Sequence, residues 1–315
     1  MIMSLSRCVV LEQDQSADKY CRGALRRVQM KRPRESGDVS DCPLFLSSEK
    51  VNPDENYVTI LLIGKTGTGK SSAANICIEP SRSQFGENPL ICEKKIRLLR
   101  DCRTLAVIDT PGLFHTTISA KEMKREMARC VSMCAPGPHV FLIVIEPKRF
   151  SREEQDMVES IKKMFGDEAT RHTMVLITHG DEMEADGVSA EKLLYFNPSF
   201  NEFVSKCLGG YHVFNNNECN SENKKKQVNE LVEKIDRMVQ RNGGLCYTND
   251  MFREAQRAID QEMFQMNGQG EPIGSRDAAE KNNSFVRAVE QTEAVGVADV
   301  VKGVRAVREA WCKTQ

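Results

Sequence analysis

A glycine-rich loop behind an apolar run is the feature of this chain with the clearest chemistry. Residues 57–63 are almost all apolar or β-branched, which predicts a buried strand. The nine residues that follow are Gly64, Lys65, Thr66, Gly67, Thr68, Gly69, Lys70, Ser71 and Ser72. A strand, a glycine-rich loop and the start of a helix, in this order, are typical of a phosphate-binding loop.

Each residue type in this loop suits a phosphate group. Gly64, Gly67 and Gly69 can adopt positive φ, so that successive backbone N–H groups turn toward an anion. A helix beginning near Lys70 adds unpaired N–H groups and the positive end of its dipole. Lys70 offers a charge for the β- and γ-phosphates, and the Ser71 hydroxyl can bind magnesium. The loop therefore predicts a nucleoside triphosphate with Mg²⁺.

Expected strands and helices alternate around this loop. Short apolar runs predict strands at residues 57–63, 96–99, 104–108, 139–145, 173–178 and 211–215. Helical spacing predicts helices at 119–134, 151–165 and 224–241, with mixed helix and loop over 182–208. We therefore predict an α/β fold with three layers. Its sheet is mostly parallel with one antiparallel edge hairpin, has helices on both faces, and binds ligands at the carboxyl ends of its strands.

Composition divides the chain into three parts. Residues 1–52 show little periodicity and are expected to be a disordered tail. Within it, residues 19–34 hold seven basic residues and no acidic one, which favours a solvated segment, with a nuclear-import signal as the alternative. Residues 56–245 contain the nucleotide-binding motifs, and residues 246–315 are expected to form a helical C-terminal extension.

Charge and hydropathy exclude several classes of protein. The 315 residues carry a net charge of −1, which gives no electrostatic basis for binding nucleic acid. The chain has no apolar run long enough for a transmembrane anchor and no full signal-peptide pattern, so we expect a cytoplasmic protein.

The twelve cysteines do not follow a metal-binding pattern, because no C-x-x-C pair and no matching histidine pair occurs. Four of them lie in apolar or helical patterns: Cys77, Cys130, Cys134 and Cys207. We expect small buried thiols rather than disulfides or zinc ligands.

A second motif, residues 109–112, follows the expected strand 104–108 and reads Asp-Thr-Pro-Gly. Asp109 suits a contact with magnesium through a water molecule, and Gly112 can bring a backbone N–H near the γ-phosphate. Loss of that phosphate would release the loop, which predicts a two-state switch.

A third motif follows the apolar run 174–177 of an expected strand and suits a nucleobase. It consists of Thr178, His179, Gly180 and Asp181. In guanine-binding G domains this place holds Asn-Lys-x-Asp, whose aspartate accepts hydrogen bonds from guanine N1 and N2. The alternative is a loop whose aspartate caps a helix. Asn215, after the last strand, is expected to contact the base from a second loop.

Four segments together resemble the GIMAP family, the GTPases of immunity-associated proteins, which belong with the septins and the chloroplast import GTPases. They are residues 64–72, 109–114, 137–154 and 242–251. The last two are not general features of G domains. The resemblance covers about residues 56–265 and favours the guanine interpretation of Thr178–Asp181.

The resemblance implies a P-loop G domain that binds GTP or GDP with Mg²⁺ and carries a helical insertion near residues 182–208. It assigns the nucleotide to the loop from Gly64 to Ser72, with Asp109, Gly112, His179, Gly180, Asp181 and Asn215. It assigns the metal to Ser71 and, through water, to Asp109. It also implies a homodimer or homo-oligomer formed through the nucleotide face.

Two departures from the family pattern concern the hydrolysis of GTP. No threonine lies between Thr68 and Thr104 to serve the first switch loop, and Ser81 and Ser83 are the nearest hydroxyls. No glutamine follows Gly112, which leaves His115 as the candidate for orienting water.

Three hypotheses follow for the function. The first is a GTP- and GDP-binding switch or scaffold that assembles in a nucleotide-dependent way and hydrolyses GTP slowly or not at all. The second is an active GTPase stimulated by dimerisation across the nucleotide face. The third is a P-loop enzyme that uses ATP, because the base motif departs from Asn-Lys-x-Asp.

Overall fold

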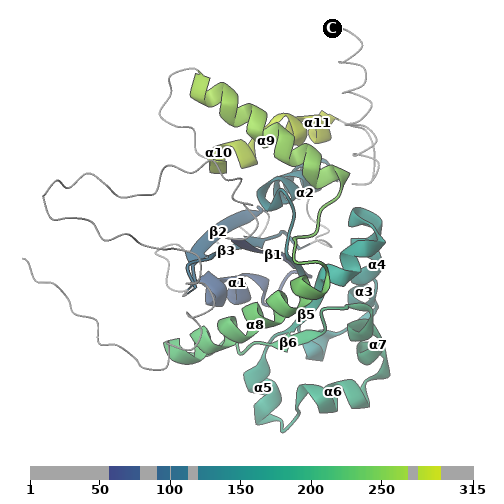
Figure 1. Cartoon of the computed structure of the whole chain (residues 1–315). Helices are drawn as coiled ribbons and strands as arrows, with labels where there is room; N and C mark the ends of the chain where they lie inside the picture. Colours follow the sequence, from purple (N-terminus) through teal and green to yellow (C-terminus); the bar gives the residue numbers. More distant parts are fainter. Residues whose placement is uncertain (1–56, 79–90, 100, 113–119, 269–275, 292–315) are drawn as a thin grey trace, which may run out of the picture. The chain divides into compact units, whose positions relative to one another are not determined.

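The computed structural model describes residues 57–78, 91–99, 101–112, 120–268 and 276–291. These residues contain a six-stranded sheet in the order β2-β3-β1-β4-β5-β6 (Figure 1). Its strands are β1 (Tyr57–Ile63), β2 (Glu93–Leu98), β3 (Thr104–Asp109), β4 (Val140–Ile145), β5 (Thr173–Ile177) and β6 (Tyr211–Val213). The β2–β3 pair is antiparallel and the other four pairs are parallel, so the expected edge hairpin is confirmed.

Strand β2 is longer than its apolar residues indicate. It begins at Glu93 instead of residue 96, and its first three residues are Glu93, Lys94 and Lys95. Charged side chains are common on edge strands, where they discourage pairing with another sheet. A search for apolar runs therefore finds only the second half of this strand.

Helices cover both faces of the sheet, which confirms the three-layer α/β fold. Helices α1 (Lys70–Ile78) and α8 (Ser221–Arg241) share a core with one face of the strands. The other face packs mainly against α2 (Ala120–Cys134), α4 (Met157–Phe165), α7 (Pro198–Lys206) and the C-terminal helices. Three short helices also lie between residues 152 and 206: α3 (Arg152–Gln155), α5 (Gly180–Ala185) and α6 (Ala190–Phe196).

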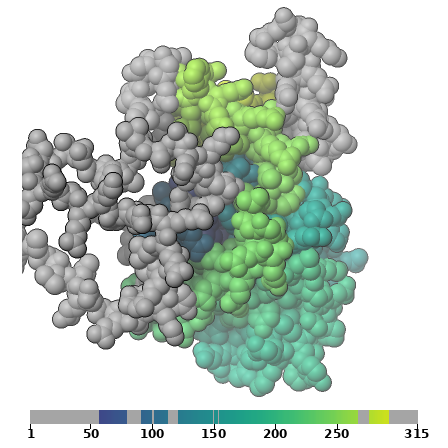
Figure 2. Space-filling view, in the orientation of Figure 1, coloured from purple at the N-terminus to yellow at the C-terminus, as the bar shows by residue number. Residues whose placement is uncertain are grey.

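Helices α9 (Asp250–Gly268), α10 (Arg276–Lys281) and α11 (Ser284–Gln291) pack beside α2 and extend its hydrophobic core (Figure 1). Figure 2 shows α9 in the upper part of this view and α8 across its middle, with the surface of α5 to α7 below them. Within the described residues, no helix combines the length and the apolar composition that spanning a membrane requires.

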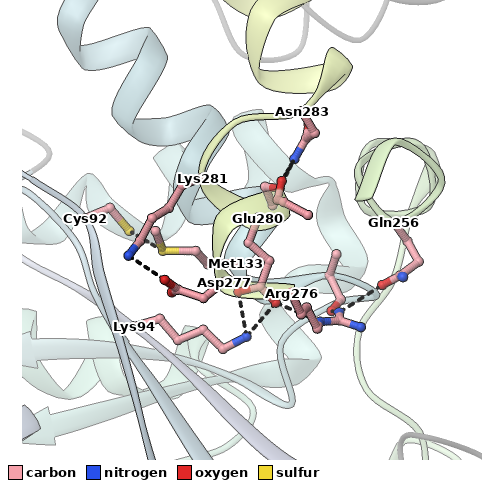
Figure 3. Close-up of polar contacts among 12 residues, drawn as sticks. Cys92, Lys94, Met133, Gln256, Arg276, Asp277, Glu280, Lys281 and Asn283 are labelled. Carbon is pink, nitrogen blue, oxygen red and sulfur yellow. Dashed lines mark hydrogen bonds and ion pairs between the residues drawn. The ribbon is translucent and has the colours of Figure 1, made fainter. Parts of the chain in front are cut away.

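Helix α10 is tied to the edge strand by a buried ion pair (Figure 3). Glu280 is 1% exposed, and its carboxylate accepts hydrogen bonds from Lys94 Nζ at 2.7 and 2.9 Å. Arg276 Nε donates to the same carboxylate at 2.8 Å. A buried carboxylate with two cationic partners fixes the position of Lys94 and hence of the start of β2.

Two of the four sequence segments that carry the family resemblance, residues 137–154 and 242–251, lie against each other. Tyr247 N–H donates to Pro138 O at 2.9 Å, and Thr248 Oγ1 donates to Pro136 O at 3.0 Å. A Cβ on Gly137 would overlap the Tyr247 carbonyl oxygen. Glycine at position 137 therefore allows the chain after α8 to pass directly over the start of β4.

The expectation that no cysteine forms a disulfide is wrong for one pair. Cys92 and Cys130 are joined, with their Cα atoms 5.9 Å apart. Cys92 lies just before β2 and Cys130 lies on α2, so tertiary packing brings them together without any pattern in the sequence. Cys77, Cys134 and Cys207 are buried free thiols, as expected, and burial raises the pKa of each thiol.

Candidate nucleotide site

Three sequence motifs meet at one edge of the sheet. The loop after β1, the end of β3 and the loop after β5 all lie at the carboxyl ends of parallel strands. Within the described residues, a cavity of about 240 Å³ is lined by the loop after β1 together with Asp109, Thr110 and Gly112. This is the edge at which α/β sheets bind their ligands.

The backbone of the loop after β1 is held by its own side chains. Lys65 O accepts hydrogen bonds from Lys70 Nζ at 2.7 Å and from Thr68 Oγ1 at 3.0 Å. Gly67 and Gly69 have φ values of 85° and 87°, as expected for a phosphate-binding loop. The loop thus keeps a fixed curve at the start of α1.

Gly64 differs from this expectation, since its φ is not positive. A Cβ at this position would lie 2.7 Å from Val144 O of the neighbouring strand β4. Glycine is therefore required at position 64 by a close approach of two backbones, and positive φ plays no part.

The residues expected to bind magnesium lie in contact. Ser71 Oγ donates to Asp109 Oδ2 at 2.6 Å, and Asp109 is 7% exposed. Its Oδ1 is buried and has no hydrogen-bond partner. Burial raises the pKa of Asp109, while the hydrogen bond from Ser71 and the charge of Lys70 oppose that rise. A divalent cation, or water bound to one, would stabilise this carboxylate.

Lys70 is a buried cation at the mouth of the same cavity. It is 7% exposed, and burial lowers the pKa of its ammonium group, while the negative charge of Asp109 opposes this shift. A phosphate group in the cavity would compensate the Lys70 charge directly. Ser71 and Ser72, on the first turn of α1, line the cavity next to it.

The Lys65 side chain extends away from this cavity. Its Nζ lies 3.0 Å from Ser151 Oγ and 3.0 Å from Glu154 Oε2. Ser151 and Glu154 form the capping box of α3, which the Ser-x-x-Glu spacing predicts. Lys65 therefore fastens the loop after β1 to the segment after β4, and only its backbone remains for a phosphate. The same loop also lies close to the end of the second motif. A Cβ on Gly112 would overlap Thr66 Oγ1.

Asp181 lies where a nucleobase is expected. Its Oδ2 accepts a hydrogen bond from Asn217 Nδ2 at 2.8 Å, while its Oδ1 is buried and has no hydrogen-bond partner. Gly180 N–H donates to Phe214 O at 2.9 Å, which joins this loop to the one after β6. His179 has a left-handed backbone with φ of 59°, and its ring lies 3.1 Å from Glu182 Oε1.

Thr178 occupies the place of the usual asparagine and connects the base loop to the phosphate loop. It is fully buried, and its Oγ1 lies within hydrogen-bond distance of Thr68 O at 3.0 Å and Ile145 O at 3.1 Å. A hydroxyl with one proton can thus hold the two loops together in place of an amide.

Two further asparagines of the loop after β6 lie at the site, next to Asn215, to which the sequence assigned a contact with the base. Asn216 Nδ2 lies 3.4 Å from Gly69 O, its Oδ1 is buried without a partner, and Asn217 contacts Asp181. The expected residue, Asn215, instead accepts a hydrogen bond from Asn217 N–H at 2.9 Å. The run of three asparagines after β6 is the signal that could have drawn attention to the whole loop.

The candidate water-orienting residue and the candidate switch hydroxyls lie outside the described residues. These are His115, Ser81 and Ser83.

Unpartnered oxygens mark both ends of the site. Asp109 Oδ1 lies at the phosphate end, and Asp181 Oδ1 and Asn216 Oδ1 lie at the base end. Because a buried acceptor without a partner costs free energy, each favours a ligand that donates a proton or carries positive charge. Guanine donates from N1 and N2, and hydrated Mg²⁺ donates from its waters, so both groups fit the residues present.

A comparison with protein families places residues 58–266 in the AIG1 family. Immune-associated nucleotide-binding protein 9 of Arabidopsis thaliana is 30% identical over 204 residues, which cover 63% of this chain and 60% of that protein. Immune-associated nucleotide-binding protein 1 of the same plant is 32% identical over 202 residues, covering 62% of this chain and 90% of that protein.

A human relative, GTPase IMAP family member 8, is 31% identical over 194 residues, which cover 60% of this chain and 29% of the relative. This chain thus spans only part of several relatives. Among solved structures, Arabidopsis thaliana Toc33 with Mg²⁺ and GMPPNP is 20% identical, with a TM-score of 0.43, covering 59% of this chain and 85% of Toc33.

Proposed function

The chain belongs to the AIG1 family, and from this premise we propose that it is a guanine-nucleotide-binding protein that takes GTP or GDP with Mg²⁺. The expected resemblance to GIMAP proteins is confirmed by this family match and by the human relative. We assign the nucleotide-binding domain to residues 56–245 and a helical extension to the region after it. Of the residues 246–315 expected for this extension, residues 269–275 and 292–315 lie outside the described part of the chain.

The observation that carries this proposal is the set of buried oxygens without partners at both ends of the site. Asp181 Oδ1 is an acceptor that guanine N1–H and N2–H₂ can satisfy, and adenine has no donor at its N1 or C2 position. At the other end, Ser71 and Asp109 would hold Mg²⁺, directly and through water, and Lys70 would bind the β- and γ-phosphates. The metal would neutralise phosphate charge when it is bound.

We further propose a switch or scaffold with slow hydrolysis or none, which assembles in pairs through the nucleotide face. The chain has no glutamine after Gly112 to orient water and no threonine between Thr68 and Thr104. In related phosphoryl transfers, an arginine supplied by a partner raises the rate by about 10³–10⁵-fold, and a glutamine orients the attacking water. The absence of the glutamine and the threonine from these sequence positions favours retention of the nucleotide over turnover.

Replacing Asp181 with asparagine is expected to change the ratio of the affinities for GDP and xanthosine diphosphate (XDP) by about 100-fold in favour of XDP. The measurement is competition against a fluorescent nucleotide. The asparagine amide would donate to xanthine O2, where guanine has an amino group. Asp186→Asn is the matched control, because Asp186 lies at the exposed end of α5 and pairs with Lys148. Unchanged preference in Asp181→Asn, or ATP binding as tight as that of GDP, would reject the guanine assignment.

Single-turnover hydrolysis of GTP against protein concentration separates the scaffold from the dimer-activated GTPase. The scaffold predicts a slow rate constant that does not change with concentration, together with a larger mass in light scattering when a GTP analogue replaces GDP. A rate constant that climbs with concentration, and that falls in His115→Ala, would instead support the active GTPase.

A further inference from the structure

The proposed nucleotide site contains a second carboxylate, from Glu93. This residue is the first of β2, lies opposite Asp109 in the antiparallel register, and lines the same cavity as Ser71 and Lys70. We propose that Glu93 is a third protein group of the divalent-cation site, acting beside Ser71 and Asp109. The proposal rests on the proposed function, because the cation is the one that accompanies the nucleotide phosphates.

The alternation of side chains along β2 directs Glu93 toward the phosphate loop. Residues 93, 95 and 97 share one face of the strand. Arg97 NH1 donates to Cys77 O at 3.1 Å, which places this face against the last turn of α1. Glu93 therefore lies on the side that carries the first turn of α1, where Ser71 is found. Directly opposite residues in such a ladder have Cβ atoms about 4.5–5.5 Å apart.

Both carboxylates have an oxygen that can accept a further ligand. Glu93 Oε2 and Asp109 Oδ1 are both buried without hydrogen-bond partners. Lys95 Nζ lies 3.6 Å from Glu93 Oε2. Adjacent carboxylate oxygens beside a serine hydroxyl are the ligand chemistry that Mg²⁺ and Mn²⁺ prefer.

The residues on either side of Glu93 are both fixed to helices of the opposite face. Cys92 is joined to Cys130 on α2, and its N–H donates to Glu126 Oε2 at 2.9 Å. Lys94 is held by Glu280 of α10 (Figure 3). Because both neighbours are anchored, the strand presents Glu93 to the cavity in one position. A carboxylate held by a strand does not depend on the γ-phosphate, so the GDP complex is expected to retain its cation.

The test uses the full chain saturated with GDP and measures Mn²⁺ affinity from the free-Mn²⁺ signal in electron paramagnetic resonance. Glu93→Gln is expected to weaken Mn²⁺ binding about tenfold, the lower end of the range for groups that support a metal site. GDP affinity in EDTA is expected to stay the same or to rise, because a negative charge near the phosphates is lost. The matched control is Glu254→Gln on α9, because the Glu254 side chain is 26% exposed, which is similar to the exposure of the Glu93 side chain.

A second variant, Lys95→Gln, tests the same site by an expected increase in Mn²⁺ affinity. Its result does not depend on whether Glu93→Gln folds. Removing the ammonium beside Glu93 is expected to strengthen Mn²⁺ binding several-fold. If both Glu93→Gln and Lys95→Gln bind GDP and bind Mn²⁺ with wild-type affinity, the role proposed for Glu93 is wrong, while the proposed function is unaffected. Failure of the unmodified chain to bind GDP in EDTA and in Mn²⁺ would instead overturn the proposed function together with this inference.

Discussion

Replacement of Lys70 by alanine is expected to weaken GDP and GTP binding by about 10²–10⁴-fold, because about two charge-assisted hydrogen bonds to phosphate oxygens are lost. Lys70 Nζ lies over the cavity with one hydrogen bond, to Lys65 O at 2.7 Å. Its ammonium is buried, so its attraction for a phosphate is screened little by solvent. The measurement is a titration of the full chain with each nucleotide in a calorimeter.

The stability of the same variant distinguishes lost binding from lost folding. Burial lowers the pKa of Lys70, which means that the charged form is held at a cost in the folded nucleotide-free chain. Removing that charge is therefore expected not to lower the free energy of unfolding by more than about 1 kcal/mol. Lys162→Ala, on the exposed side of α4 and paired with Glu159, is the control. Retained nucleotide affinity in Lys70→Ala would refute the assignment of the site.

Replacement of Gly137 by alanine is expected to lower the free energy of unfolding by about 3 kcal/mol or more, measured by urea denaturation. The added Cβ would overlap the Tyr247 carbonyl oxygen, which is a backbone atom. Tyr247 cannot move away easily, since its N–H binds Pro138 O and its hydroxyl binds Phe165 O. The segment after α8 would have to shift as a whole.

Gly187→Ala is the matched control for this prediction. Gly187 also lies in a loop, with φ of 65°, but a Cβ there would meet nothing within 4 Å. Its replacement is expected to cost only the strain of a left-handed alanine, about 1–2 kcal/mol. Equal losses in the two variants would show that the contact between residues 137 and 247 contributes no specific stability.

The fold follows from local patterns to a large extent. Buried strands β1, β4 and β5 are continuous apolar runs. The glycine-rich loop follows β1 and Asp109 ends β3, so the parallel pairing of these two strands brings the loop and Asp109 together. The stripe of apolar residues on α8 is likewise buried as its spacing predicts. Such features depend on neighbours in the sequence, which explains why they can be predicted.

The remaining features depend on contacts between distant residues. The Cys92–Cys130 disulfide joins two elements that touch only after folding. The charged start of β2 carries Glu93 into the cavity because its partner strand ends at Asp109. The orientation of Asn216 and Asn217 toward Gly69 and Asp181 is set by the course of a loop, and no spacing rule specifies it.

Calorimetric titration of the full chain with GDP and with ADP, in the presence of Mg²⁺, tests the guanine-nucleotide assignment most directly. We expect GDP to bind about 100-fold more tightly than ADP or better, because Asp181 Oδ1 is a buried acceptor for guanine N1–H and N2–H₂, and adenine has no donor at N1 or C2. Equal affinity for the two nucleotides, or binding of neither, would contradict the account.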